Sequence, residues 1–595
     1  MRIYFENYPY PSSEVKPYLG AMHILLNDED ITSDKQQLGR IGYLFVSNGE
    51  YNEPIFILPK SFLIKDDDGR YTVLGIPDVH PEDVIDTDNE NNPLEVLGKE
   101  TLLPELGLWL YRALNRFRNE NQGTPIGLEA ELDAMLPEED SRDKDFLSTV
   151  LELIDFLKEH RNLFTQISLI NHSGRNKIDW PKTVTGDPFY ENGEPWYLDP
   201  AIKEKAVNID DRLIVLYYSV LKYLRDKYKF PIDLGEVPYQ LLPTTEIQQM
   251  LETGTGSKEM KRIRHKYFRD DLKHLWSLLD SFFTHNTSDD DRDERKEYLL
   301  IKKVEVFFEK MIDAIISDPT GVEALKNQPD GKLIDHIFRY TSLVGKLSDI
   351  YYIGDSKYYM DGNNPEGVAL YKQFTYARNA IQFHIEKLYL ENRKPAVPIR
   401  KGDIRYRDTL TEGYNITPNF FIRSRVTKDD ATYDSPALMM TEWDKAKGQK
   451  YPKTNKHFED RLFDRDTLLL REFSINFLFV IAAYAGYEDT YWASEIRTTI
   501  RDSFIRSIDE EYSFYILTPD NATGTVKFNF LYSEWTRGKI YTIDETGEHF
   551  ILAFEKSRKG QEDLEAFKSA KLRSAETGEE VTYTLSPTTL EALDS

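Results

Sequence analysis

The segment 334–357 reads IDHIFRYTSLVGKLSDIYYIGDSK and contains two short runs that are rich in apolar, β-branched and aromatic residues. Such runs are typical of β-strands, and the second one, around 350–353, is apolar enough to predict a central strand. Side chains alternate between the two faces of a strand, so we expect Asp355 and Lys357 on one face and Ser356 on the other. A carboxylate and an ammonium group would then share one small site at the end of a buried strand.

Two further carboxylates are expected near this pair. Asp335 lies in the strand-like run upstream, and Glu309 lies in a predicted helix, VEVFFEKMIDAII, at the border of its apolar stripe. Carboxylate oxygens suit Mg²⁺, which neutralises a scissile phosphate and lowers the pKa of the attacking water. We therefore predict that Asp335 and Asp355 bind Mg²⁺, or Mn²⁺ in its place, with help from Glu309. Lys357 would orient the water or stabilise charge in the transition state.

Two other residues compete for places in this site. Asp349 is an alternative first acid, but it lies only six residues before Asp355, which leaves little room for a hairpin. Asp335 is therefore preferred. His336 follows Asp335, and we expect it to face the opposite side of its strand as a structural histidine and not as a metal ligand.

Patterning along the rest of the chain predicts a multidomain α/β protein. Strand-like runs within 1–75 and an acidic linker at 77–93 indicate a β-rich N-terminal domain at 1–120. Apolar residues then recur at helical spacing, which predicts a helical middle region at 121–295 for recognition or partner docking.

A second charged break, at 286–297, precedes the segment that carries the candidate site. We place a catalytic domain at 296–520, with a mixed sheet flanked by helices, and a β-rich C-terminal tail at 521–595. The helices expected in the catalytic domain are 298–316, 368–390 and about 464–486.

Composition excludes several classes of protein. The chain has 595 residues, no cysteine, and 102 acidic against 75 basic side chains, a formal net charge of −27. The lack of cysteine excludes disulfide frameworks, thiolate metal sites and cysteine nucleophiles. The longest strongly apolar run, 475–487, is too short to cross a membrane, and the N-terminus shows no secretory signal. We therefore expect a cytoplasmic protein without membrane contact.

The negative charge is distributed unevenly. Residues 1–100 carry 19 acidic and 8 basic side chains, whereas residues 301–450 carry 21 acidic and 23 basic side chains. The stretch 391–428 has nine basic against four acidic side chains, so it is the better candidate for following a DNA phosphate backbone. Its candidate DNA contacts are Arg400, Arg405 and Arg407.

The order of these elements resembles the PD-(D/E)XK nuclease superfamily, whose core is a mixed sheet flanked by helices in the order α-β-β-β-α-β. The matching parts are the helix with Glu309, the strand with Asp335, and the strand that ends in the Asp355-x-Lys357 motif. One position departs from the consensus, because Ile334 stands where the superfamily has proline. The resemblance implies a restriction-endonuclease-like fold and phosphodiester hydrolysis.

The helix after this motif contains LYKQFTYARNAIQF. Its Gln373 and Tyr376 resemble a glutamine–tyrosine pair of several branches of the superfamily, at a spacing one residue shorter. The resemblance implies that Gln373 and Tyr376 contact the active-site lysine or the DNA backbone.

In four segments the chain is similar to the LlaJI-type restriction endonucleases, relatives of McrC-type restriction subunits. The segments are GRNKIDWPKTV (174–184), YYIGDSKYY (351–359), GYNITPNFFI (413–422) and RLFDRDTLLLREFSINFLFVIAAYA (461–485). This resemblance implies cleavage of invading DNA by a type II or McrBC-like endodeoxyribonuclease. Some relatives work beside an AAA+ GTPase motor, and this sequence contains no Walker A motif of its own.

Our leading hypothesis is a Mg²⁺-dependent DNA endonuclease of a prokaryotic restriction system, an antiviral defence enzyme that acts on double-stranded DNA. Its expected partners are a cognate methyltransferase or an AAA+ GTPase subunit, and a double-strand break predicts a homodimer or repeated nicking. The alternative is a McrC-like subunit, inert alone, that docks on and stimulates an AAA+ motor. A third hypothesis is a nuclease-fold protein that only binds nucleic acid.

Overall fold

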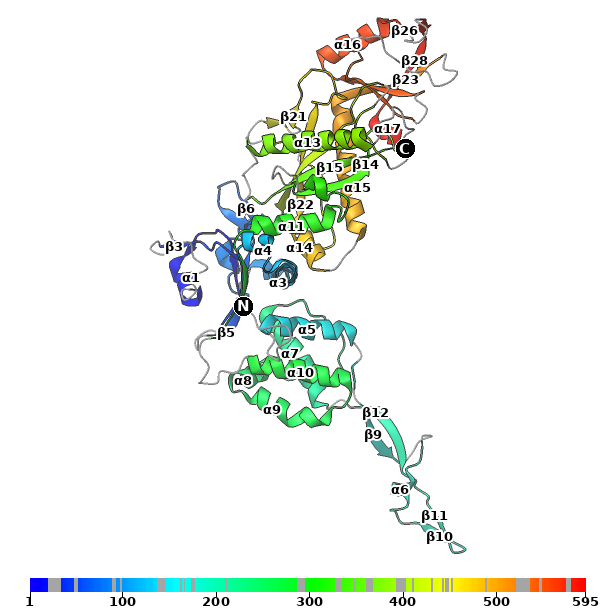
Figure 1. The fold of residues 1–595 in the computed structure, drawn as a ribbon. Helices are drawn as coiled ribbons and strands as arrows, with labels where there is room; N and C mark the ends of the chain where they lie inside the picture. Colours follow the sequence, from blue (N-terminus) through cyan, green and yellow to red (C-terminus); the bar gives the residue numbers. More distant parts are fainter. Residues whose placement is uncertain are drawn as a thin grey trace.

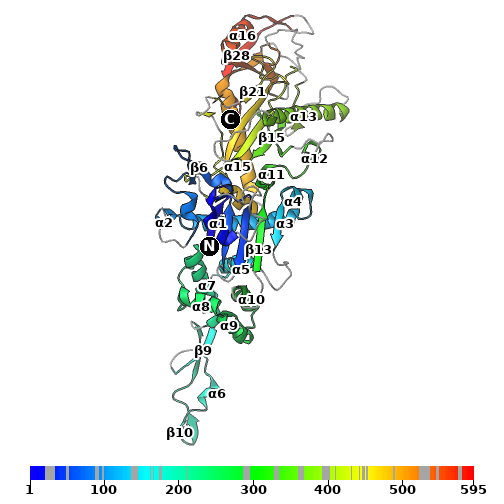
Figure 2. The same cartoon turned by 90° about the vertical axis from the view of Figure 1, so that its left-hand side faces the viewer.

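The computed structural model shows several β-sheets with helices packed on them, which confirms the predicted mixed α/β class (Figures 1 and 2). The residues that it describes are 1–19, 34–47, 52–87, 93–96, 99–135, 145–160, 163–164, 166–172, 177–208, 211–285, 295–326, 334–346, 348–359, 368–391, 403–408, 411–429, 432–440, 443–444, 449–450, 453–486, 490–520, 536–544, 548–573 and 579–594.

An N-terminal sheet has the strand order β1-β5-β4-β13-β8. Its strands are β1 (Arg2–Phe5), β4 (Ile41–Ser47), β5 (Asn52–Leu58), β8 (Leu132–Met135) and β13 (Arg295–Ile301). The β1–β5 pair is parallel and the other pairs are antiparallel. Because β8 and β13 come from later in the chain, the strands of this sheet belong to three of the four predicted domains. The predicted domain boundaries stay predictions.

Smaller elements surround this sheet. They are β2 (Tyr10–Pro11), α1 (Ser12–Leu19), β3 (Lys35–Gln36), β6 (Leu63–Lys65), β7 (Tyr71–Val73), α2 (Pro93–Val96) and α4 (Pro125–Glu129). The long helix α3 (Leu102–Asn121) contacts β4 and β13 and closes the core on one face.

The middle of the chain is helical, as its periodicity predicts. The helices are α5 (Phe146–Glu159), α7 (Arg212–Tyr228), α8 (Thr244–Glu252), α9 (Thr255–Ile263) and α10 (Asp270–His285). Aspartates cap two of them: the side chain of Asp145 accepts from the N–H of Ser148 at the start of α5, and Asp211 caps α7 in the same way.

Between α5 and α7 the chain forms an arm that projects from the helices (Figures 1 and 2). Strands β9 (Gln166–Asn171) and β12 (Ile202–Val207) pair antiparallel at its base, and β10 (Phe189–Glu191) and β11 (Glu194–Trp196) form a hairpin at its tip. The short helix α6 (Trp180–Thr183) lies between them.

The sheet that carries the candidate site has the order β14-β15-β17-β22-β18. Strands β14 and β15 are antiparallel, whereas β15, β17 and β22 are parallel, so the sheet is mixed as predicted. The bounds are β14 (His336–Thr341), β15 (Ser348–Lys357), β17 (Pro418–Arg425), β18 (Met439–Met440) and β22 (Leu468–Asn476), with β16 (Asp403–Ile404) beside β15 and β21 (Lys453–Asn455) beside β22.

Helices cover both faces of this sheet. Helix α13 (Val368–Glu391) contacts β15, β17 and β22, and its Tyr376 packs in one cluster with Tyr351 and Ile353. Helix α11 (Val304–Ile316) contacts β14 and β15, and Tyr352 belongs to the main core on that side. The odd-numbered residues of β15 therefore point to the α13 side.

Two predicted helices are wrong in part. Residues 295–301 form β13 and not the start of a helix, because this run pairs with β4 on one side and β8 on the other; α11 begins at Val304. Residues 468–476 form the strand β22, which is buried on both faces and therefore shows no period that separates strand from helix. Only α14 (Phe477–Ala485) is helical there, and Asn476 caps it by accepting from Leu478 N–H.

A four-stranded sheet lies toward the C-terminus, with the order β24-β25-β23-β28. Helix α15 (Thr490–Glu511) leads directly into it, and the remaining bounds are β23 (Tyr512–Pro519), β24 (Ile540–Thr542), β25 (Phe550–Glu555), α16 (Arg558–Ser569), β28 (Tyr583–Thr588) and α17 (Leu590–Asp594). The strand expected at TVKFNFLY lies outside the described residues. No described helix is long and apolar enough to cross a membrane.

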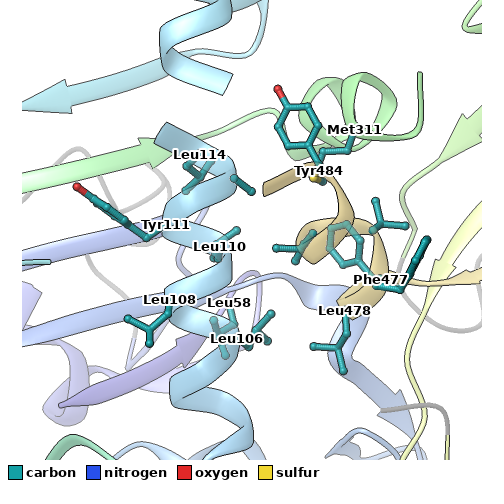
Figure 3. Packing of buried hydrophobic residues seen from close by; sticks show 14 of the residues in the cluster. Leu58, Leu106, Leu108, Leu110, Tyr111, Leu114, Met311, Phe477, Leu478 and Tyr484 are labelled. Atoms are coloured by element: carbon teal, nitrogen blue, oxygen red, sulfur yellow. The ribbon is translucent and has the colours of Figure 1, made fainter. Parts of the chain in front are cut away.

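The N-terminal sheet and the sheet that carries the candidate site share one hydrophobic core. Figure 3 shows Leu110 and Leu114 of α3 beside Phe477 and Tyr484 of α14, with Met311 of α11 next to them. Polar contacts join the same helices, since the Tyr484 hydroxyl donates to Glu120 Oε2 at 2.8 Å. The sheet that carries the candidate site is therefore anchored to the N-terminal half of the chain.

Candidate active site

Asp335 and Asp355 meet where β14 begins and β15 ends. His336 pairs with Gly354 across the antiparallel ladder, so the residues one step outward, Asp335 and Asp355, lie opposite each other. Asp355 is only 5% exposed, and Asp335 is half-buried. Asp335 Oδ2 accepts a hydrogen bond from the backbone N–H of Ser356 at 3.4 Å. The structure thus brings the two predicted strand carboxylates together.

Lys357 completes this group. Its ammonium forms an ion pair with Asp355 Oδ2, and its Nζ lies 5.5 Å from the centre of the Phe421 ring on β17. Asp355 and Lys357 share the α13 side of the sheet, while Ser356 points to the other side, as the alternation of a strand requires. A cation and two carboxylates therefore occupy one small volume at the sheet edge.

The electrostatics of Asp335 indicate that negative charge outweighs positive charge in this volume. Burial raises the pKa of Asp335 well above its ordinary value, and the hydrogen bond and charge of Asp355 raise it further. Lys357 opposes this effect only in part. Two carboxylates so close resist ionising together unless a cation lies between them. Mg²⁺ is commonly held by one or two carboxylates with water and phosphate oxygens, so this donor pair fits it.

Glu309 approaches the site from α11, on the other side of the sheet. Burial raises its pKa, the positive charge of His336 opposes this, and the charge of Asp355 acts in the same direction as burial. No hydrogen bond joins Glu309 to either strand acid in the described part of the chain, and those residues contain no group of three or more His, Asp or Glu side chains that could hold a metal. Glu309 thus lies beside the pair of acids and interacts with them through charge.

His336 organises the α11 side of the site. It is fully buried, its Nε2 lies 2.5 Å from Ser356 Oγ, and its Nδ1 lies 3.6 Å from Asp313 Oδ1. Burial alone would raise the pKa of Asp313, but the nearby His336 and the ion pair with Lys326 hold that pKa well below its usual range. As predicted, His336 faces away from the side that carries Asp355 and Lys357.

Gln373 and Tyr376 are buried beneath the site. Gln373 Nε2 donates to Asn419 Oδ1 at 2.7 Å and to the carbonyl of Ile353 at 3.3 Å, which fastens α13 to β17 and β15. Tyr376 is 3% exposed and packs in the apolar cluster under α13. Neither hydrogen bond of Gln373 reaches Lys357, so the structure shows this residue supporting the strands of the site.

Lys372, which sequence analysis did not single out, adds a second cation. Its Nζ lies 5.5 Å from the centre of the Tyr376 ring. Burial would lower the pKa of Lys372, but a hydrogen bond with Tyr376 and the charges of Asp335 and Asp355 outweigh burial and raise it. The available sequence signal was its place next to Gln373 in the helix after the lysine strand.

The three predicted DNA-contacting arginines have different surroundings. Arg405 pairs with the fully buried Asp408 at 2.6 Å, and Asp408 also accepts from the N–H of Thr542, so Arg405 helps to join the catalytic and C-terminal sheets. Arg407 is exposed, with its Nη2 3.8 Å from Glu412. Arg400 lies outside the described residues.

Three comparisons with known proteins give one family model and a solved structure. No curated protein sequence matches the chain. One similar solved structure is a half-complex from the tetradecameric assembly of Thermococcus gammatolerans McrB AAA+ hexamers with bound McrC, at 11% identity over 85% of this chain and 99% of that chain, with a TM-score of 0.24. A likeness of that size supports no statement about function. A family model described as LlaJI restriction endonuclease, however, matches residues 98–389, and this range includes the carboxylates and the lysine of the site.

Proposed function

We propose that this protein is a Mg²⁺-dependent DNA endonuclease of a prokaryotic restriction system, with Mn²⁺ able to replace Mg²⁺. The observation that carries the proposal is the meeting of Asp335 and Asp355 beside Lys357 at the end of a buried strand. The match to the LlaJI restriction endonuclease model supports a restriction endonuclease and, with it, double-stranded DNA as the substrate. The two carboxylates and the lysine suit metal-assisted hydrolysis of a phosphodiester bond.

Asp335 and Asp355 would hold the metal. Bound there, Mg²⁺ supplies a Lewis acid for the scissile phosphate and lowers the pKa of water. Asp355 keeps Lys357 at the site through their ion pair. The Lys357 ammonium orients the attacking water or stabilises charge that develops on the phosphate. Glu309 adds negative charge, which raises the pKa of Asp335 further and would attract a cation to the site.

The proposal is tested by incubating supercoiled plasmid with the full chain in Mg²⁺, in Mn²⁺ and in EDTA. Nicked or linear product that requires the metal supports an endonuclease. A chain that binds DNA but yields no product in any condition, alone or with a motor partner, would leave only a nucleic-acid-binding role.

A second candidate function is favoured by the arm in the helical middle. Its exposed aromatic and aliphatic side chains are more than half accessible to solvent; they are Trp180, Val184, Phe189, Tyr190, Trp196 and Leu198. The tip, residues 187–199, carries four acidic and no basic side chains, which suits a protein surface better than DNA. We propose as the alternative that the chain is a McrC-like subunit, inert alone, which docks on and stimulates an AAA+ GTPase motor.

The two candidates separate in one experiment. Plasmid cleavage is measured with and without an AAA+ GTPase motor of the McrB type, for the full chain and for a Trp196→Ala, Phe189→Ala variant of the arm. A self-contained enzyme cleaves without the motor, and the variant matches it. A motor-dependent subunit cleaves only with the motor, and the variant loses both co-purification with the motor and cleavage.

A further inference from the structure

A run of basic side chains lies on the surface of the helical middle, outside the candidate active site. Residues 258–269 read KEMKRIRHKYFR and contain six basic side chains and one acidic one, in a chain whose net charge is −27. The run covers most of α9, the 3₁₀ turn Arg264–Lys266 and the approach to α10. Its six basic side chains are all exposed, and we call them the α9 surface; they are Lys258, Lys261, Arg262, Arg264, Lys266 and Arg269.

The other side of this segment is buried, which fixes its direction. Met260 and Ile263 pack into the core, and Trp276 Nε1 of α10 donates to the carbonyl of Met260 at 2.8 Å. The Tyr267 hydroxyl donates to Asp211 Oδ1 at 3.0 Å. Packing and hydrogen bonds therefore hold the segment against the helices, and its charged side chains point to solvent.

The one acid within the run does not neutralise the α9 surface. Glu259 accepts two hydrogen bonds from Arg212 of α7, at 2.8 Å and 3.0 Å, so its charge is already balanced from another helix. Arg262 Nη2 also lies 3.4 Å from Glu259 Oε1. Lys258 and Lys266 form no ion pair with any residue in the described part of the chain. Positive charge therefore remains at both ends of the run.

Acids of α10 offset only part of this charge. Asp271 forms an ion pair with Arg269. Burial raises the pKa of Asp280, and the positive charges of Lys261 and Arg264 oppose this effect. The six basic side chains thus have fewer acids beside them than they would need to be neutral.

The chemistry of the α9 surface suits a nucleic acid. Clustered and unpaired Lys and Arg side chains are the electrostatic footprint of a phosphate backbone. Phe268 is 81% exposed between Lys266 and Arg269, where it can contact a sugar or the edge of a base.

The arm beside it has the opposite charge. Arg269 Nη1 donates to the carbonyl of Phe164 at 3.2 Å, just before β9 at the base of the arm. The tip of the arm, residues 187–199, carries four acidic and no basic side chains. Two neighbouring surfaces of opposite charge suit different partners, so the α9 surface is not an extension of the arm.

We propose that the α9 surface binds the phosphate backbone of duplex DNA at a distance from the bond that is cleaved. The N-terminal sheet lies between α9 and the strand β15 of the candidate site (Figures 1 and 2). The α9 surface therefore holds the substrate without taking part in hydrolysis. The inference rests on the proposed function in taking DNA as the partner.

The test measures binding of a blunt-ended DNA duplex to the full chain without divalent metal, over a range of salt concentrations. Each phosphate contact contributes about 0.9 to the slope of log affinity against log salt concentration. A variant with Lys258→Ala, Lys261→Ala and Lys266→Ala should therefore lower the slope by about 2.7 and weaken binding roughly tenfold or more at moderate salt. All three lysines are exposed, so their loss leaves the core intact.

A matched control removes the same charge elsewhere. Lys16, Lys568 and Lys571 are exposed on α1, on α16 and directly after it. Their joint replacement with Ala should leave the slope unchanged.

Two further measurements separate the α9 surface from the active site. Phe268→Ala should weaken DNA binding without changing the slope, because an apolar contact releases no counterion. In plasmid cleavage with Mg²⁺, the triple lysine variant should need more DNA for half-maximal rate and should cleave at the wild-type rate when saturated.

Each outcome bears on a different claim. A wild-type slope in the triple lysine variant overturns the DNA contact while the nuclease proposal stands. If that variant binds DNA normally but no longer co-purifies with an AAA+ motor, the α9 surface is a protein-docking face and the DNA contact is overturned. Lysine-dependent DNA binding without cleavage supports the α9 surface and overturns the nuclease proposal. No DNA binding by the wild type overturns both.

Discussion

Tyr358, the residue after Lys357, donates a hydrogen bond to Glu6 Oε2 at 2.6 Å, although the two residues directly follow strands of different sheets, β15 and β1. The backbone N–H of Lys60 donates to the Tyr358 hydroxyl at 3.1 Å, and Lys60 Nζ lies 3.4 Å from Glu6 Oε1. All three contacts are at the end of the strand that carries the candidate lysine. The N-terminal sheet therefore holds the active-site strand in place through a small polar network.

Replacing Tyr358 with Phe should destabilise the protein by about 1–3 kcal/mol, because the buried Glu6 loses a donor while its carboxylate stays buried. Burial already raises the pKa of Glu6, which shows how little solvation this carboxylate has. Urea unfolding measures the effect, and the matched control is Tyr190→Phe on the exposed arm, which should be neutral. Equal urea midpoints for the wild type, Tyr358→Phe and Tyr190→Phe would show that this polar network contributes nothing to stability.

The Asp313–His336 pair predicts a pH dependence of stability. The pKa of Asp313 is depressed in the folded state, so the stability it contributes is present above its unfolded value near 4 and is lost as the pH falls through the folded value. Asp313→Asn should cost about 1–3 kcal/mol at pH 7, and the difference from the wild type should shrink below about pH 4. Unfolding curves of both proteins between pH 3 and pH 7 give this difference directly. If the difference in free energy of unfolding between the wild type and Asp313→Asn does not change with pH, the pairing of Asp313 with His336 is contradicted.

Removal of metal should expose the repulsion between Asp335 and Asp355. The pKa of Asp335 is raised, so its contribution to stability is present below its unfolded pKa and is lost as the pH rises through the folded value. In EDTA at neutral pH, Asp335→Asn should therefore unfold at a higher temperature than the wild type. Mg²⁺ should stabilise the wild type, by about 2.7 kcal/mol at one hundred times its dissociation constant, and leave the variant unchanged.

Thermal unfolding with and without Mg²⁺ measures both effects, and Asp270→Asn serves as control because Asp270 is fully exposed on α10. A wild type that gains nothing from Mg²⁺, together with a destabilised Asp335→Asn, would mean that the two carboxylates do not form a metal site.

The features that sequence predicted well are those with a local physical cause. Alternation along β15 is a property of the strand itself, so the shared face of Asp355 and Lys357 followed from spacing alone. The middle helices followed from the helical spacing of their apolar residues.

The features that sequence missed depend on partners far away in the chain. Leu468–Asn476 is a strand because it lies between β17 and β21, and nothing within the run itself separates a buried strand from a buried helix. Gln373 is buried because Asn419 accepts its hydrogen bond. The pairing of Arg423 with Glu472 requires the register of β17 against β22, which spacing in the sequence does not reveal.

The most direct test of the account is the rate of plasmid cleavage in Mg²⁺ by Lys357→Ala, measured in a single turnover and with any motor partner that the wild type requires. Lys571→Ala is the matched control, since Lys571 forms an exposed ion pair with Glu580 far from the site. Loss of one donor to a developing charge lowers the rate of a reaction by about 10²–10³-fold. We therefore expect the cleavage rate of Lys357→Ala to fall by that factor while its DNA affinity is unchanged. Lys571→Ala should match the wild type. Cleavage by Lys357→Ala at the wild-type rate would contradict the assignment of this site.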